Sequence, residues 1–266
     1  MSELTELRDL AVRAAREAGA LLLERFGGPA SGLSAKSSRT DLVSDADRDA
    51  EALIVGMLRD ARPDDGLIAE EGSSAESTSG VRWLVDPLDG TTNYLWGIPV
   101  WAVSIAAEDS DGHLVGVVHD PCRDEMFVAT RGGGASLDGA RLAPEPLTEL
   151  PVALVATGFS YQPEVRRRQA EIVTSLIGRV RDIRRFGSAA IDLAWVAAGR
   201  FDGYYESGLS PWDLAAGAAL VREAGGVAEP VTLRPGEAPI FVAARPGLRD
   251  ALCGAVGDAM MEAARR

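Results

Sequence analysis

The chain has 266 residues, of which 46% are hydrophobic and 25% charged, and its formal net charge at pH 7 is −13. This composition is typical of a soluble globular protein, and so negative a surface repels nucleic acid, which is therefore not an expected partner. No apolar run approaches the roughly 20 residues that a membrane span needs. The acidic start of the chain does not resemble a signal peptide, so we expect a cytoplasmic protein without a membrane partner.

Cysteine and histidine are scarce, with Cys122, Cys253, His113 and His119 as the complete set. Two cysteines provide no disulfide framework, and a zinc site draws mainly on clustered cysteine and histidine. Any bound metal must therefore be held by oxygen ligands, which favours Mg²⁺, Mn²⁺ or Ca²⁺.

Hydrophobic spacing in the first half of the chain predicts two helices followed by a sheet. Ser44 is the expected N-cap of the second helix, and Lys36 lies in the loop before it. From residue 67 onward, short runs rich in valine and isoleucine alternate with turn residues, as strands do. The predicted elements are a helix over 3–26, a loop over 30–43, a helix over 45–61 and a sheet over about 67–145.

The second half of the chain alternates between strand and helix patterns. The predicted elements are strands over 151–160, 181–186, 202–206, 227–233 and 240–244, and helices over 163–179, 188–199, 210–224 and 246–263. This mixed order predicts an α/β (α+β) fold in which sheets and helices form layers. We expect two subdomains, residues 1–145 and 146–266, packed into one compact unit.

The segment WLVDPLDGTTN, residues 83–93, is the strongest local signal of chemistry. An apolar strand delivers Asp86, and a turn restricted by proline places Asp89 three residues later, so that both carboxylates and the Leu88 carbonyl can converge on one hard cation. Gly90 allows a sharp turn, after which the backbone N–H groups of Gly90 and Thr91 can face a phosphate. The alternative is an ordinary Asp-Gly turn after a strand.

Further acidic residues occur at strand ends and in the first turns of helices. Glu70 and Glu71 follow a strand pattern, and since neighbouring strand residues face opposite sides, only one of them is expected to be a ligand. Asp213 and Asp47 each lie three residues after an expected N-cap serine, where an acid also serves as a capping residue. Capping explains both positions without any function, although a capping acid can also point into a site at the helix mouth.

Several other signals are weaker. The glycine-rich segment RGGGASLDG follows a strand but opens no helix, which argues against a dinucleotide site. The arginines between residues 166 and 185 are interspersed with acids and read as a solvated face. No cysteine–histidine pair or serine–histidine–acid triad is evident, whereas four carboxylates and a carbonyl suit two or three divalent ions. Attack by metal-activated water is therefore the simplest mechanism.

Five segments together resemble the inositol monophosphatase family in order and spacing. They are DLVSDAD, IAEEG, WLVDPLDGTTNY, RRFGSAAIDLAWVAAGRFDGYYE and SPWDLAAGAALVREAGG. The resemblance covers nearly the whole chain. It implies a layered αβαβα sandwich of the inositol monophosphatase and fructose-1,6-bisphosphatase type, a homodimer, and lithium-sensitive activity that depends on Mg²⁺. Mn²⁺ is possible as well, because it shares the ligand preferences of Mg²⁺.

The resemblance also implies roles for single residues. Asp47 and Thr91 match the catalytic pair that helps Glu70 to orient the attacking water, Glu71 matches a supporting acid, and Lys36 matches a basic residue on a mobile loop at the entrance. The implied metal ligands are Glu70, Asp86, the carbonyl of Leu88, Asp89 and Asp213. The implied substrate-binding residues are Asp89, Gly90, Thr91, Ala189, Glu206 and Asp213.

The expected function is hydrolysis of a small phosphorylated polyol, myo-inositol-1-phosphate, to inositol and phosphate. Leu88 and Tyr94 stand where isoleucine and phenylalanine are commoner, and the middle of GLSPWD differs from many relatives, which affects the leaving-group pocket. Fructose-1,6-bisphosphate, histidinol phosphate and a nucleotide phosphate are alternative substrates for the same fold and mechanism. A binding partner of the transcription machinery is the alternative without catalysis.

Overall fold

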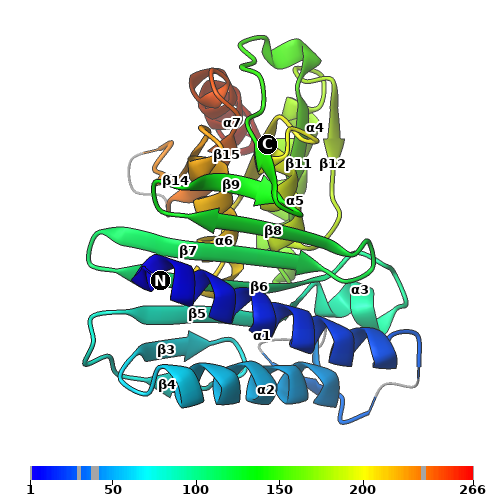
Figure 1. Cartoon of the computed structure of the whole chain (residues 1–266). Helices are drawn as coiled ribbons and strands as arrows, with labels where there is room; N and C mark the ends of the chain where they lie inside the picture. Colours follow the sequence, from blue (N-terminus) through cyan, green and yellow to red (C-terminus); the bar gives the residue numbers. More distant parts are fainter. Residues whose placement is uncertain (1, 29–30, 37–41, 235–237, 266) are drawn as a thin grey trace.

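The computed structural model describes the chain except for residues 1, 29–30, 37–41, 235–237 and 266 (Figure 1). Two β-sheets alternate with layers of helices. The helical elements of the described chain are α1 (Glu3–Arg25), α2 (Asp45–Ala61), α3 (Thr91–Leu95), η1 (Leu150–Val152), α4 (Pro163–Leu176), α5 (Ala189–Ala197), α6 (Pro211–Glu223) and α7 (Arg249–Ala263).

The larger sheet is drawn from the first half of the chain. Among the described residues it has eight strands, in the order β10 (Ala140–Leu142), β9 (Gly134–Leu137), β8 (Glu125–Thr130), β7 (Gly112–Asp120), β6 (Ala102–Asp109), β5 (Arg82–Asp89), β3 (Gly66–Ala69) and β4 (Ser74–Ala75). β3 and β5 run parallel, and the other neighbours are antiparallel.

The smaller sheet comes from the second half. Its order within the described chain is β12 (Asp182–Arg184), β11 (Leu154–Thr157), β13 (Gly203–Glu206), β15 (Ile240–Ala244) and β14 (Val227–Val231). β11 runs parallel to both of its neighbours, whereas β15 is antiparallel to β13 and β14. β1 (Ser34–Ala35) and β2 (Leu42–Val43) form a separate antiparallel pair.

Three clusters of buried apolar residues define the layers. The first joins α1 and α2 to one face of the larger sheet, and α1 crosses that face in Figure 1. The second fills the space between the two sheets, where α5 and α6 lie. The third joins the outer face of the smaller sheet to α4 and α7. The order helix, sheet, helix, sheet, helix confirms the predicted αβαβα sandwich.

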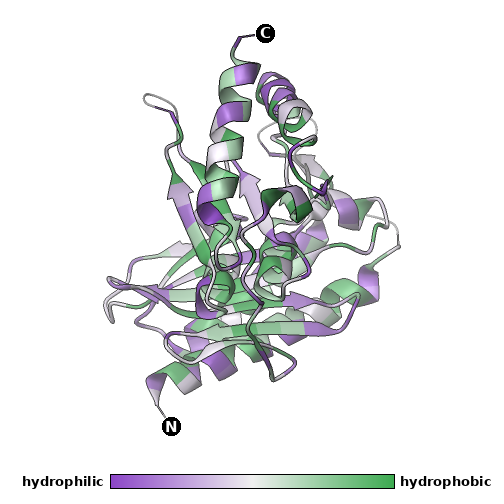
Figure 2. Ribbon diagram, turned by 90° about the horizontal axis from the view of Figure 1, so that it is seen from above, coloured by the Kyte–Doolittle hydropathy of each residue, from purple (hydrophilic) through white to green (hydrophobic). Residues whose placement is uncertain are grey.

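The composition of each helix matches its layer. The outer helices present one apolar stripe, and hydrophilic and hydrophobic stretches alternate along them in Figure 2. α5 is buried almost all round, and its alanines allow close approach of a sheet on either side. A helix without a polar face fits only in such a position between two layers.

Most predicted elements are confirmed, with ends that differ by a few residues. The predicted helix over 163–179 ends at Leu176, and the predicted strand over 151–160 is reduced to Leu154–Thr157. α3 was not predicted, because its five residues contain too few positions to show a helical period. The loop predicted over 30–43 contains β1 and β2, and its other positions lie partly outside the described residues. The subdomain boundary after residue 145 stays a prediction.

Membrane insertion finds no support in the helices. Within the described residues, none combines the length and the apolar character that crossing a bilayer requires.

Close packing of α5 against α6 gives a first testable prediction. A Cβ atom at buried Gly217 would lie 2.5 Å from the Cβ of Leu193, so Gly217→Ala is expected to lower the free energy of unfolding by about 1–3 kcal/mol. Gly56, also inside a helix, has open space around it, and Gly56→Ala should raise that free energy by about 0.4–1 kcal/mol. Urea unfolding measures both variants, and equal effects would contradict this account of the packing.

Candidate active site

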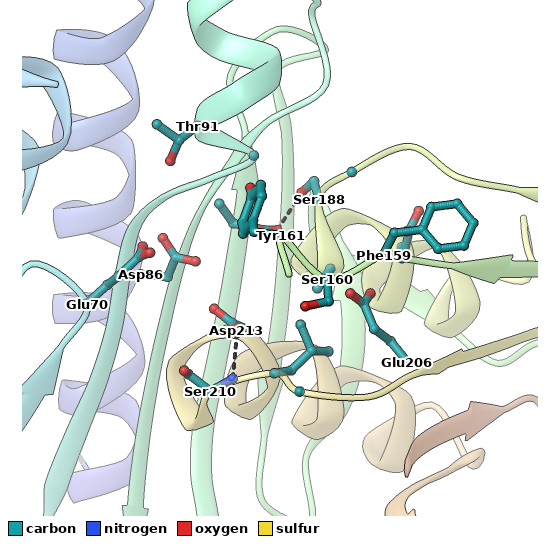
Figure 3. A pocket seen from close by; sticks show the side chains of 18 of the residues that line it. Glu70, Asp86, Thr91, Phe159, Ser160, Tyr161, Ser188, Glu206, Ser210 and Asp213 are labelled. Carbon is teal, nitrogen blue, oxygen red and sulfur yellow. Dashed lines mark hydrogen bonds between the residues drawn. The ribbon is translucent and has the colours of Figure 1, made fainter. Parts of the chain in front are cut away.

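A cavity of about 450 Å³ opens where the two sheets approach each other (Figure 3). It lies at the ends of β5 and β13 and at the first turns of α3, α5 and α6. Acidic side chains are its most frequent charged groups. They are Glu70, Asp86, Asp89, Asp192, Glu206 and Asp213.

A β-bulge in β5 explains why two aspartates three residues apart reach the same pocket. Asp86 pairs with Ser104 of β6 and Asp89 pairs with Ala102, so β5 contains one extra residue between these pairs. In a regular strand, residues three apart point to opposite faces, and the bulge changes this relation. Pro87 lies in the bulge, where its missing N–H costs no regular ladder bond.

Asp89 is held by the first turn of α5. Its Oδ2 accepts hydrogen bonds from the Ser188 hydroxyl at 2.5 Å and from the Ala190 N–H at 2.7 Å. Burial raises the pKa of Asp89 to about 6, although these two donors oppose the rise, and the charge of Glu70 adds to it. The carboxylate therefore has a fixed position and an unfavourable charge.

Asp86 and Asp213 are likewise buried close to other carboxyl groups. Burial raises the pKa of Asp86 well above its usual value, and the carboxyl groups of Glu70, Asp89 and Asp213 raise it further. Burial and the charge of Asp89 likewise raise the pKa of Asp213. Asp213 Oδ2 accepts the N–H of Ser210 at 2.7 Å, so the predicted capping contact at the start of α6 is present (Figure 3).

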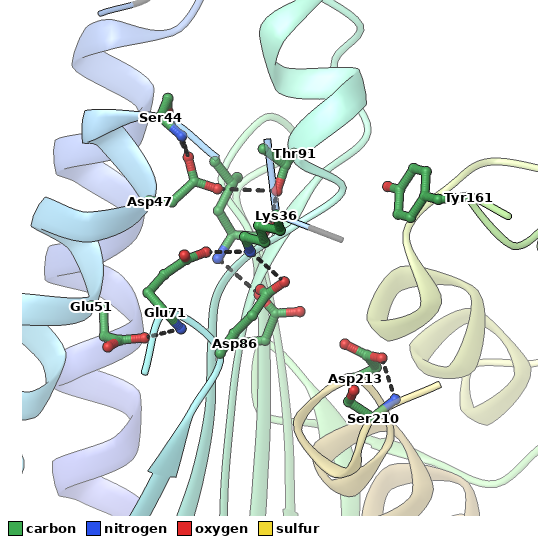
Figure 4. A network of polar contacts seen from close by, with 12 residues as sticks. Lys36, Ser44, Asp47, Glu51, Glu71, Asp86, Thr91, Tyr161, Ser210 and Asp213 are labelled. Carbon is green, nitrogen blue, oxygen red and sulfur yellow. Dashed lines mark hydrogen bonds and ion pairs between the residues drawn. The ribbon is translucent and has the colours of Figure 1, made fainter. Parts of the chain in front are cut away.

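Asp47 and Thr91 form a second polar chain beside the pocket (Figure 4). The Thr91 hydroxyl lies 3.0 Å from Asp47 Oδ1 and 3.1 Å from the Leu88 carbonyl, and its single proton serves one of them at a time. Asp47 Oδ2 accepts from the backbone N–H and the hydroxyl of Ser44, at 2.9 and 2.5 Å. Asp47 is thus a capping residue of α2 and at the same time orients Thr91.

Lys36 supplies positive charge beside Glu70 and Glu71 at the edge of the pocket (Figure 4). Its Nζ lies 2.8 Å from Glu70 Oε1 and 2.6 Å from Glu71 Oε1. Burial raises the pKa of Glu71 to about 7, and the effect of burial exceeds the opposing effect of Lys36. The Glu71 N–H donates to Glu51 Oε2 at 2.6 Å, which fixes the backbone between the two glutamates.

Gly90 connects β5 to α3 and lies in the left-handed region, with φ of 95°. A Cβ atom there would be 3.0 Å from the Val100 carbonyl, so both backbone conformation and space require glycine. Thr91 is the first residue of α3, and the N–H groups of a first turn have no partner within the helix. These N–H groups are suited to an anion.

The donor set fits a hard cation by its chemistry. It consists of carboxylate and carbonyl oxygens, and mutual repulsion of the buried carboxyl groups is relieved by positive charge. Within the described part of the chain, no three cysteine, histidine, aspartate or glutamate side chains lie close enough to form a finished metal cage. Lys36 pairs with Glu70, and Asp89 accepts a hydrogen bond from the first turn of α5.

The structure brings the predicted site residues to one place, with two exceptions in a supporting position. Asp47 and Glu71 do not line the pocket but contact residues that do. Asp47 accepts a hydrogen bond from Thr91, and Glu71 forms an ion pair with Lys36. The predicted residues that line the pocket are Lys36, Glu70, Asp86, Leu88, Asp89, Gly90, Thr91, Ala189, Glu206 and Asp213.

The lining residues that were not predicted as part of the site include Arg185, Ser188 and Asp192. Ser188 precedes an alanine-rich helix, and this N-cap position was a usable signal that it faces the helix mouth. Asp192 is a single polar residue in an otherwise apolar helix, which was also a signal. Arg185 has no local signal, since it follows another arginine in a short strand–turn segment.

The fold and the pocket define a class of layered α/β proteins with an acidic cavity between two sheets. The chain belongs to the inositol monophosphatase family, whose model matches residues 3–258. The protein called Nus factor SuhB in Escherichia coli strain K12 is 44% identical over 226 residues, which cover 84% of this chain and 85% of that protein.

Solved structures agree with this assignment. The extragenic suppressor protein suhB of Bartonella henselae is 38% identical and superposes with a TM-score of 0.87, covering 94% of this chain and 98% of that one. A Thermotoga maritima IMPase is 29% identical, with a TM-score of 0.86 and coverage of 96% and 98%. Mycobacterium tuberculosis SuhB is 36% identical, with a TM-score of 0.80 and coverage of 97% and 98%.

Repulsion among the carboxyl groups gives a second prediction. Asp86→Asn removes one charge while its amide oxygen still accepts the Leu88 N–H, so in EDTA at pH 7.5 the free energy of unfolding should rise by about 1–2 kcal/mol. Asp60→Asn, at an exposed helix position, should change it by less than about 0.5 kcal/mol. A lower urea midpoint for Asp86→Asn than for the wild type would contradict the repulsion.

Proposed function

We propose that this protein is a phosphomonoesterase that depends on Mg²⁺ and hydrolyses myo-inositol-1-phosphate to inositol and phosphate. The observation that carries the proposal is the convergence of Asp86, Asp89 and Asp213 on one cavity beside the Gly90–Thr91 turn. Family membership supports phosphatase chemistry, and the carboxyl groups alone would repel an anionic ester. A cation is therefore part of the proposal.

The proposed ligands of two or three ions are the carboxylates of Glu70, Asp86, Asp89 and Asp213 with the Leu88 carbonyl. Mn²⁺ has the same ligand preferences and is an alternative to Mg²⁺. When bound, such ions would neutralise phosphate charge and lower the pKa of water.

The remaining polar residues would position the reactants. Thr91, held by Asp47, would orient the attacking water together with Glu70. The N–H groups of Gly90 and Thr91 would bind phosphate oxygens. Ion pairing to Lys36 keeps Glu70 in place at the pocket wall, 2.8 Å from the ammonium group.

The leaving group would lie against the side of the pocket formed by Ala189 and Glu206. Ala189 leaves space there, and the carboxyl group of Glu206 is an acceptor for hydroxyl groups. Fructose-1,6-bisphosphate, histidinol phosphate and a nucleotide phosphate remain alternative substrates, and a homodimer and lithium sensitivity remain proposals that rest on the family.

A substrate panel tests the function. Phosphate release is measured from myo-inositol-1-phosphate, fructose-1,6-bisphosphate, histidinol phosphate and adenosine 3′-phosphate, each with Mg²⁺ and with EDTA. Inositol-1-phosphate should lead, EDTA should abolish turnover, and Asp89→Asn should lower kcat at least about 100-fold, because Asp89 lies in both the proposed metal and substrate sites.

Exposed Asp60→Asn is the matched control for the panel and should keep wild-type turnover. A different leading ester would overturn the substrate and leave the hydrolytic mechanism standing. Turnover of inositol-1-phosphate that persists in EDTA would overturn the metal requirement.

A second candidate function is binding to the transcription machinery. It rests on the name of the Escherichia coli relative, Nus factor SuhB. The arginines near residues 166–185 are largely engaged within the chain. Arg179 pairs with Asp258, Arg184 with Asp182, and Arg166 donates to backbone carbonyls. With the net charge of −13, this pattern favours contact with protein over contact with RNA.

Pull-down with purified RNA polymerase tests the second candidate. If the binding role is separate from catalysis, Asp89→Asn should retain the polymerase as well as the wild type does, since that residue lies inside the pocket. Capture of neither polymerase nor RNA by the wild type would rule this candidate out.

A further inference from the structure

Asp192 is a buried acid that the proposed function does not use. It lies on α5 with 1% of its surface exposed, and it lines the pocket together with Glu206 and Asp89. Its Oδ1 atom is fully buried and has no hydrogen-bond partner among the described residues. A buried carboxyl oxygen without a donor is costly, so its presence calls for a partner that enters from the pocket.

Helix capping does not account for Asp192. The N-cap of α5 is Ser188, whose side chain accepts from the Ile191 N–H. Asp47 and Asp213, which also lie in first turns, each accept the N–H of their N-cap serine. Asp192 lies one position further along its helix, and no such contact to it is present in the described chain.

The surroundings of Asp192 point to the leaving-group side of the pocket. Glu206 is its neighbour there, and Glu206 Oε2 accepts the Tyr204 hydroxyl at 2.6 Å. Burial raises the pKa of Asp192, and the carboxyl groups of Glu206 and Asp89 raise it further, while the guanidinium of Arg185 opposes them. Burial raises the pKa of Glu206 to about 7. A carboxyl group accepts hydrogen bonds from hydroxyl groups whether or not it holds a proton, which suits a polyol.

We propose that Asp192 is a specificity residue that, with Glu206, binds two hydroxyl groups of the leaving group. The inference rests on the proposed phosphomonoesterase function. It adds Asp192 to the Glu206 side of the pocket, where one hydroxyl group of the leaving group fills the open valence of Asp192 and another contacts Glu206. An ester whose leaving group has no hydroxyl groups gains nothing from Asp192.

The test compares two esters in the Mg²⁺-loaded enzyme. One is myo-inositol-1-phosphate, and the other is p-nitrophenyl phosphate, whose leaving group has no hydroxyl beyond the ester oxygen. Asp192→Ala should lower kcat/KM for inositol-1-phosphate about tenfold, mainly through KM, and change that for p-nitrophenyl phosphate less than about twofold. Asp192→Asn, which still accepts and donates, should restore inositol-1-phosphate to within about threefold of wild type.

Asp120→Asn is the matched control, since Asp120 is also a buried acid but pairs with Arg123 away from the pocket. It should leave the ratio between the two esters unchanged. Equal losses on both esters in Asp192→Ala would show that Asp192 only supports α5 and Asp89, and would overturn the inference.

Failure of the inference and failure of the function are distinguishable. A wild-type enzyme that hydrolyses inositol-1-phosphate, with a ratio between the two esters that Asp192→Ala leaves unchanged, would overturn the inference alone. A wild-type enzyme that hydrolyses neither ester would overturn the proposed function and the inference with it.

Discussion

The arrangement of the pocket depends on the repulsion among carboxyl groups that the fold buries together. Asp86, Asp89 and Asp213 are brought from β5 and α6 into one cavity, and the pKa of each is raised there. Separate local contacts keep them in place despite this repulsion: a bulge for Asp86, the first turn of α5 for Asp89, and the start of α6 for Asp213. Positive charge in the pocket would relieve the repulsion among these carboxyl groups.

Helix starts serve two purposes in this architecture. The acids of α2 and α6 each satisfy an N-cap N–H, and this same contact fixes the side chain next to the pocket. Asp47 and Asp213 therefore each cap a helix and lie in or beside the pocket. The capping interpretation of Asp47 and Asp213 is confirmed, and their roles at the site stay a proposal.

Local sequence patterns predicted the layers and several acids of the pocket, and the family resemblance added Ala189, Glu206 and Lys36. The alternation of strands and helices, the DPLDGT segment and the two capping acids are all visible within a few residues. The bulge at Pro87 was not predictable, since it depends on the register against Ser104 and Ala102, far along the chain. Asp192 was not predicted as a site residue for a related reason. Its open oxygen is a property of the whole pocket, and in the sequence it is one acid in an alanine-rich helix.

The two sheets divide the pocket in a way that bears on specificity. In the first half of the chain, Glu70 follows β3, β5 carries Asp86 and Asp89, and α3 begins with Thr91. In the second half, α5 carries Asp192 and β13 carries Glu206. The groups proposed for metal and phosphate are therefore anchored mainly in the larger sheet, and those proposed for the leaving group in the layers around the smaller one. The first turn of α5 belongs to both sides, because its backbone donates to Asp89 while its side chains line the side proposed for the leaving group. We therefore expect side-chain changes at Asp192 or Glu206 to alter the leaving group that is accepted without moving the carboxylates of β5.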